Sequence, residues 1–240
     1  MYAIAEDRDG NVWVGTHGGG LSRWGGERFT SLTTEYGLAD GGVRVIFEDR
    51  EGSLWIGTAG SGLHRLKDGR FTTFTTQEGL SSNLVYPVYE DRAGDVWIGT
   101  EDHGLNRLSG GRVSTYSTKQ GLASDHVWSI DEGHDGSLWL GTGAGLSRLK
   151  DGKFTNFTTR EGLSANMVWA VHEGRDGSLW IGTFGGGLNR LKNGRFDVYT
   201  SEDGLPDTSV RAIQEDRQGS LWVGTFDGGV SRLRDGRFTT

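Results

Sequence analysis

The chain has 240 residues and a formal net charge of −7, from 25 basic and 32 acidic side chains. This acidic balance argues against a general phosphate-binding surface, so no nucleic-acid partner is expected. The sequence has no cysteine, which excludes a disulfide framework, a thiolate metal site and a cysteine nucleophile. It also contains no run of 18 apolar residues and no signal peptide at its start, so neither a membrane segment nor a targeting signal is predicted.

A motif of the form G-x-[LV]-W-[ILV]-G-T recurs six times along the chain. Its tryptophans succeed one another at intervals of 41 or 42 residues. A fixed period of this length indicates a repeat architecture, in which each repeat is one supersecondary unit. The 42 glycines favour many short strands joined by tight turns over helices. The motif tryptophans are Trp13, Trp55, Trp97, Trp139, Trp180 and Trp222.

The second repeat predicts four strands, at residues 43–48, 53–58, 63–66 and 70–75, which we name A to D. Turn signals separate them at 49–52, in the Gly-rich loop 59–62 and at 67–69, and residues 77–83 lead to the next strand A. Four antiparallel strands in a repeat of about 40 residues match one blade of a β-propeller, with strand D outermost. We therefore predict an all-β fold, a six-bladed β-propeller.

The same pattern predicts one domain over residues 1–240. Each blade is contiguous in sequence, so no blade borrows a strand from the other end of the chain. Closure of the ring would then depend on packing of the sixth blade against the first. A closed ring predicts a monomer, and an open-ring oligomer is the alternative. The blades are expected at approximately 1–42, 43–84, 85–126, 127–167, 168–209 and 210–240.

Several side chains recur in every repeat and are expected to be scaffold. The motif tryptophans should fill the space between adjacent blades, because a large ring buries about 150–250 Å². Three polar positions also recur: the glutamate ending strand A, the threonine ending strand B and the arginine of strand C. A residue needed once per blade is expected to form a blade-to-blade hydrogen bond or ion pair. The glutamates are Glu6, Glu48, Glu90, Glu132, Glu173 and Glu215, and the arginines are Arg23, Arg65, Arg107, Arg148, Arg190 and Arg232.

These residues resemble a known family, the two-component regulator propeller repeat. The resemblance is carried by segments such as EGRDGSLWIGT at 173–183, GL at 187–188 and DGLP at 203–206, and it covers the whole chain. In that family the repeats form the extracytoplasmic sensor portion of bacterial hybrid histidine kinases, often as paired propellers that sense glycans. The resemblance implies a non-enzymatic, periplasmic or extracytoplasmic module that binds a ligand or partner.

The sequence also departs from the family pattern. Family sensors usually carry more than six repeats, and no kinase motif, immunoglobulin-like connector or DNA-binding domain is present here. The chain starts at the first residue of a strand A and ends within a strand D, and neighbouring repeats are unusually alike. These features favour an excised, recently duplicated or engineered fragment. A propeller scaffold with no ligand of its own is therefore an alternative function.

Residues that differ between repeats are the candidates for a binding site, because scaffold positions agree. The second residue of strand A differs in this way, and chain tracing places it with the B-to-C loops on one face, at the channel mouth. Aromatic and guanidinium groups offer stacking faces and forked donors, which suit a sugar or an acidic glycan. Alternatively, the rings only pack against the neighbouring blade. These residues are Tyr2, Arg44, Tyr86, Trp128, Trp169 and Arg211.

The B-to-C loops add further candidates for the same surface. They vary between blades more than the strands do, and they carry aromatic, acidic and imidazole side chains. The ligand candidates among them are His17, His103, Phe184 and Phe226, beside Glu101, Asp102 and Asp227.

An enzyme is the second alternative, because some propellers place acids and bases at their channel. Asp131 and His172 share one strand A position in adjacent blades, with Gln214 next, and an Asp–His pair can support general base chemistry in a lyase or hydrolase. The segment 7–11 resembles only the start of a calcium loop, without its distant glutamate. We therefore expect no enzyme, no metal and no cofactor.

The repeats also predict an oligomeric state. If the six blades close on themselves, light scattering should give the mass of one chain in a homogeneous peak. A mixture of multiples of that mass would contradict the closed monomer.

Overall fold

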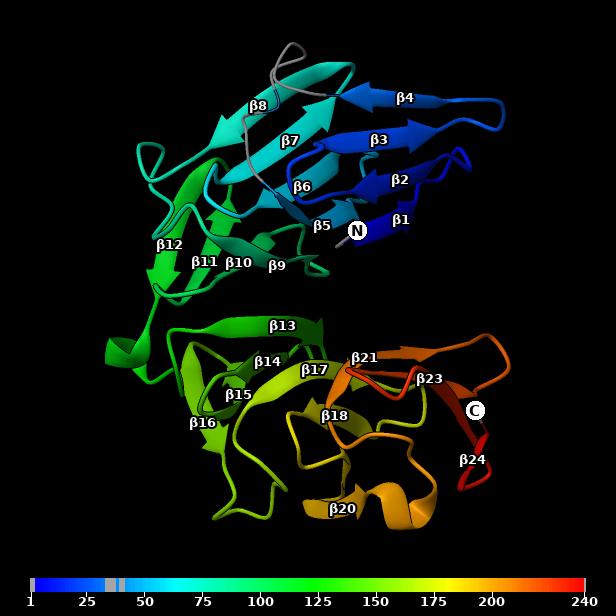
Figure 1. The fold of residues 1–240 in the computed structure, drawn as a ribbon. Helices are drawn as coiled ribbons and strands as arrows, with labels where there is room; N and C mark the ends of the chain where they lie inside the picture. The colour runs from blue at the N-terminus through cyan, green and yellow to red at the C-terminus, as the bar shows by residue number, and fades with distance from the viewer. Residues whose placement is uncertain (1–2, 33–37, 39–41, 240) are drawn as a thin grey trace. The chain divides into compact units, whose positions relative to one another are not determined.

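The computed structural model describes residues 3–32, 38 and 42–239. It consists of two compact units, Met1–Tyr116 and Ser117–Thr240. Each unit contains three antiparallel sheets of four strands (Figure 1). The organisation of residues 1–240 as one domain stays a prediction.

The first unit contains the first three sheets. Their strands are β1 (Ala3–Glu6), β2 (Val12–Gly15), β3 (Leu21–Trp24) and β4 (Phe29–Leu32); β5 (Val43–Glu48), β6 (Leu54–Thr58), β7 (Leu63–Lys67) and β8 (Arg70–Phe74); and β9 (Val85–Glu90), β10 (Val96–Thr100), β11 (Leu105–Ser109) and β12 (Arg112–Tyr116).

The second unit contains three further sheets and two short 3-10 helices, η2 (Thr118–Gln120) and η3 (Ser201–Asp203). Its strands are β13 (Val127–Glu132), β14 (Leu138–Thr142), β15 (Gly145–Lys150) and β16 (Lys153–Phe157); β17 (Val168–Glu173), β18 (Leu179–Thr183), β19 (Leu188–Lys192) and β20 (Arg195–Tyr199); and β21 (Val210–Glu215), β22 (Leu221–Thr225), β23 (Val230–Arg234) and β24 (Arg237–Thr239).

The six sheets confirm the predicted fold class, a six-bladed β-propeller. In each sheet the strands are hydrogen-bonded in sequence order, from A to D, and every strand of a blade comes from one continuous segment. The strands predicted for the second repeat agree with β5 to β8 to within one residue at either end. Each sheet lies inside one of the blade ranges expected from the sequence.

Motif tryptophans lie between neighbouring blades of a unit, as predicted. Trp55 packs with Leu80 of the connection after its own blade and with Val85 and Ile98 of the third blade. Trp139 packs likewise with Val168 and other residues of the fifth. These two tryptophans are almost fully buried, so their large apolar faces leave water.

The turn from strand A to strand B is held by an aspartate. Asp49 lies three residues before the turn glycine and accepts hydrogen bonds from the Trp55 indole Nε1–H at 2.8 Å and the Ser53 backbone N–H at 2.7 Å. Burial alone would raise the pKa of Asp49, but these hydrogen bonds outweigh it and hold the pKa below its usual range. The same acceptor for the indole recurs at Asp7, Asp91 and Asp216.

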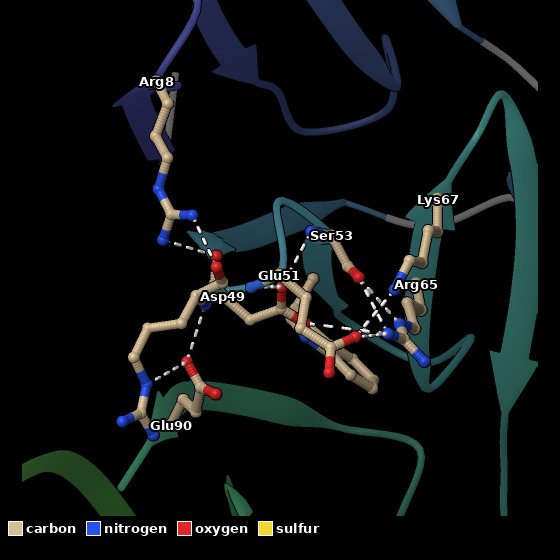
Figure 2. A network of polar contacts seen from close by, with 9 residues as sticks. Arg8, Asp49, Glu51, Ser53, Arg65, Lys67 and Glu90 are labelled. Carbon is tan, nitrogen blue, oxygen red and sulfur yellow. Dashed lines mark hydrogen bonds and ion pairs between the residues drawn. The ribbon is translucent and has the colours of Figure 1, made fainter. Parts of the chain in front are cut away.

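The glutamate that ends strand A connects neighbouring blades of each unit, as predicted. Its carboxylate accepts a hydrogen bond from a backbone N–H in the A-to-B turn of the preceding blade. Glu48, for example, accepts from the Arg8 N–H at 2.9 Å. Glu90 accepts from Arg50 at 2.8 Å (Figure 2). Glu173 and Glu215 form the same contacts in the second unit.

The recurrent arginine and threonine act mainly within their own blade, which differs from the prediction, although Thr183 Oγ1 also lies 3.3 Å from Ser164 Oγ of the preceding blade. Thr58 donates through Oγ1 to the Gly62 carbonyl, which closes the B-to-C loop. Arg65 stacks over Trp55 of its own sheet and donates to Ser53. The period of the sequence shows that a residue recurs, but it does not show in which direction its side chain reaches.

A second residue, which the sequence analysis did not single out, also joins neighbouring blades. Arg8, the residue after the turn aspartate of the first blade, donates to the Asp49 and Arg50 carbonyls of the second at 2.9 and 2.6 Å (Figure 2). Arg175 donates similarly to the Arg217 carbonyl. Arginine occupies this position in five of the six repeats, with His134 in the fourth, so the repeat pattern does carry a signal for it.

The turn network predicts a large effect of one carboxylate on stability. Asp49→Ala leaves the buried indole and backbone N–H groups without an acceptor, so we expect the free energy of unfolding to fall by about 2–4 kcal/mol. Urea denaturation measures it. Glu51→Ala is the matched control, since Glu51 is 68% exposed and water screens its ion pairs, so its loss of stability should be much smaller. Equal losses in the two variants would contradict this role of Asp49.

The same carboxylate predicts a pH dependence. Because the pKa of Asp49 is lower in the folded state, its ionised form contributes stability above the unfolded pKa of about 4, and this is lost as pH falls through the folded value. The free energy of unfolding should therefore fall less between about pH 5 and 3 in Asp49→Asn than in the wild type. Identical pH dependence in both proteins would contradict the assignment.

Candidate functional site

The second residue of strand A occupies a β-bulge. In β5, for example, Val43 pairs with Thr58 and Val45 with Gly57, so Arg44 is an extra residue without a partner position on β6. Comparable register shifts occur at this point in β9, β13, β17 and β21. A bulge re-aims a side chain out of the regular ladder. The positions that vary between blades are therefore also those where the backbone departs from the repeat's regular pairing.

Close packing around Gly57 accompanies the bulge. A Cβ atom at this glycine would lie 2.5 Å from Val45 and 2.7 Å from Val85 of the next blade. Gly182 is similarly close to Val210. Glycine in strand B thus lets the next blade's first strand approach.

In the first unit, two candidate residues contact each other across a blade boundary. The guanidinium carbon of Arg44 lies 4.1 Å from the centre of the Tyr86 ring in the next blade. Its Nη1 is 3.3 Å from Oε2 of Glu101, the first residue of the third blade's B-to-C loop. The positive charge of Arg44 is therefore already paired with a carboxylate.

In the second unit, four candidate residues form one cluster. The Trp169 ring lies 4.6 Å from Phe184 and 6.1 Å from Phe226, measured between ring centroids. The guanidinium carbon of Arg211 lies 4.4 Å from the Trp169 ring centre and 4.9 Å from that of Phe226. Phe184 and Phe226 remain 49% and 55% exposed. We name Trp169, Phe184, Arg211 and Phe226 the aromatic–arginine cluster.

Backbone contacts hold the two phenylalanines of this cluster. The Phe184 N–H donates to the Met167 carbonyl, and the Phe226 N–H donates to the Ser209 carbonyl, each at 2.9 Å. The Asp207 carboxylate accepts the next N–H of the loop, from Asp227, at 3.0 Å. This hydrogen bond and one from the Ser209 N–H keep the pKa of Asp207 below its usual range. The D-to-A connections therefore fix the B-to-C loops.

The other candidates make contacts of their own or lie outside the described residues. Trp128 stacks on His126 in the fourth blade, with ring centroids 6.0 Å apart. His103 is exposed and contacts Asp102, with Nδ1 2.9 Å from the carboxylate. His17 is exposed at the start of the first B-to-C loop. Tyr2 lies outside the described residues.

The structure brings Asp131 and His172 together, as their shared strand position suggested. Nδ1 of His172 is 3.4 Å from Asp131, and its Nε2 is 3.9 Å from the Glu215 carboxylate. That Nε2 is buried and has no hydrogen-bond partner. Asp131 in turn accepts the Glu173 backbone N–H at 2.7 Å. Because Nε2 is buried and Nδ1 faces the Asp131 carboxylate, the geometry favours a structural contact between blades.

Known proteins share both the repeat and the fold. The family description "Two component regulator propeller" matches residues 1–18, 37–60, 79–102, 121–144, 162–185 and 204–227, which is more than half of the chain. The chain belongs to the two component regulator propeller family. The six matches include the strand A start and the first B-to-C loop residue of every blade, and so all candidate positions except His103.

Solved structures of sensor proteins resemble this propeller. The extracellular domain of the hybrid two component system BT3049 from B. thetaiotaomicron is 28% identical, with a TM-score of 0.84 over 97% of this chain and 32% of that chain. The extracellular domain of the one component system BT4673 from the same organism is 20% identical, with a TM-score of 0.78 over 100% of this chain and 35% of that one. This propeller thus spans about a third of the length of these proteins.

An enzyme also shares the fold. Virginiamycin B lyase from Staphylococcus aureus is 20% identical, with a TM-score of 0.81 over 99% of this chain and 82% of that chain, which shows the fold alone. Among curated proteins, no match was found. None of the helices in the described residues has the length and apolar character needed to cross a membrane.

Proposed function

We propose that this propeller is a non-enzymatic ligand-binding module of the sensor type, located outside the cytoplasm, and that it binds a carbohydrate on the aromatic–arginine cluster. The observation that carries the proposal is the exposure of Phe184 and Phe226 beside Trp169. Large apolar side chains gathered at an exposed surface indicate an interaction site.

The chemistry of the cluster suits a sugar. The C–H groups of a pyranose form an apolar face that can pack on an aromatic ring, while its hydroxyl groups need donors and acceptors. Phe184 and Phe226 supply exposed rings, and Arg211 supplies N–H donors beside them. Rings fixed by backbone hydrogen bonds lose little conformational entropy when a ligand binds.

Membership of the family and the likeness to extracellular domains of two component systems support a sensor role and an extracytoplasmic location. The buried Nε2 of His172 supports the absence of general base chemistry at the Asp131–His172 pair. A scaffold without a ligand would need no exposed ring at the loop positions of Phe184 and Phe226, where the other blades carry His17, Ala59, Glu101 and Gly143.

A glycan array tests the proposal. We expect the wild type to bind a subset of oligosaccharides, and Phe184→Ala and Trp169→Ala to lose affinity by roughly tenfold or more, since each removes about 1.4 kcal/mol or more of stacking and burial. Phe29→Ala is the matched control, because Phe29 is 61% exposed on β4, outside the cluster. Trp128→Ala reports on the fourth blade separately.

Two outcomes would contradict the proposal. Binding to no sugar, or binding indifferent to both cluster variants, would favour the scaffold without a ligand. Cleavage of a bound oligosaccharide, detected by chromatography and lost in His172→Ala, would favour a hydrolase or lyase.

A further inference from the structure

The two arginines at the bulge position differ in their charge environment. Arg44 in the second blade is paired with Glu101, at 3.3 Å. Arg211 in the sixth blade is exposed, and no carboxylate of the described residues lies within ion-pair distance of its guanidinium. Since both side chains also stack on an aromatic ring, the acidic partner is the principal difference between them.

The two arginines contact B-to-C loops of different blades. Glu101 is the first residue after strand B in the third blade, and Phe226 is the first residue after strand B in the sixth. Arg44 therefore meets a carboxylate in the B-to-C loop of the next blade, whereas Arg211 meets an aromatic ring in the B-to-C loop of its own blade. The nearby Asp207 is already occupied by the backbone N–H groups of Asp227 and Ser209.

The orientation of Arg211 leaves its donors available. Its guanidinium lies over two ring faces, those of Trp169 and Phe226, at 4.4 and 4.9 Å. The planar guanidinium carries a fork of N–H donors that matches a carboxylate. No hydrogen bond from Arg211 to another described residue is present.

We propose that the aromatic–arginine cluster selects acidic carbohydrates, with the carboxylate of a uronate residue bound by Arg211 and its sugar ring packed on Phe184 or Phe226. The inference rests on the proposed function, which it narrows to one class of ligand. The uronate carboxylate would replace water on the guanidinium of Arg211, beside the exposed phenylalanine rings. A neutral sugar gains the stacking contact alone.

Isothermal titration calorimetry with a matched ligand pair tests the inference. The pair consists of uronate-containing oligosaccharides and the same oligosaccharides after reduction of their carboxyl groups to alcohols. We expect the acidic form to bind the wild type roughly 10- to 100-fold more tightly, the range of a charge-assisted hydrogen-bonded contact. Arg211→Gln should abolish this difference, and Arg211→Lys should keep only part of it, because lysine lacks the planar fork.

Arg44→Gln is the matched control and should leave the difference unchanged, because Arg44 is already paired with Glu101. Phe226→Glu places a carboxylate beside Arg211, whose guanidinium carbon lies 4.9 Å from the Phe226 ring centre, and should reduce binding of the acidic form most. Its fold is checked by thermal unfolding alongside Phe226→Leu, which removes the ring without adding charge.

The outcomes separate this inference from the broader proposal. If neither form binds, both fail. If both forms bind equally and Phe184→Ala weakens both, the carbohydrate site stands and selection for acidic ligands is overturned. Retention of the acidic preference in Arg211→Gln, or its loss in Arg44→Gln, would also overturn the role of Arg211.

Discussion

Within each unit, neighbouring blades are joined by a carboxylate that the later blade supplies to the earlier one. The glutamate that ends strand A binds the turn of the preceding blade, as Glu48 does with the Arg8 N–H and Glu90 with the Arg50 N–H. Beside it, the turn aspartate binds the indole N–H of a buried tryptophan. These hydrogen bonds satisfy polar groups at the edge of an apolar interface, where an unpaired N–H would cost about 1–3 kcal/mol. The contact fixes how neighbouring sheets within a unit stack.

This arrangement assigns different roles to the two ends of the strands. The A-to-B turns, with their aspartates and arginines, are committed to joining blades. At the opposite end of strand A, glycine in strand B brings adjacent backbones close, and the bulge turns a variable side chain out of the ladder. Residues there can change with little effect on the scaffold. In the second unit this freedom has produced an exposed group of aromatic rings around an arginine without an acidic partner among the described residues.

Much of the fold could be predicted from the sequence, because a period of about 42 residues and the turn glycines define four strands per blade. The aromatic and arginine positions of the candidate site could also be predicted, from their variation. The reach of Arg65 and Thr58 could not, since both contact their own blade, and recurrence carries no information on direction. Arg44 has an acidic partner at the start of the next blade's B-to-C loop. Arg211 instead contacts a phenylalanine at the start of its own blade's B-to-C loop. Only the spatial contacts reveal this difference.

The central claim is that the recurrent residues form the scaffold and the residues at the bulges and B-to-C loops of the fifth and sixth blades bind the ligand. A crystal structure of the chain soaked with a uronate oligosaccharide tests it most directly. The account predicts a sugar ring in contact with Phe184 or Phe226, its carboxylate within hydrogen-bond distance of Arg211, and unchanged turns around Asp49. A sugar bound instead at the A-to-B turns, or away from all four cluster residues, would contradict it.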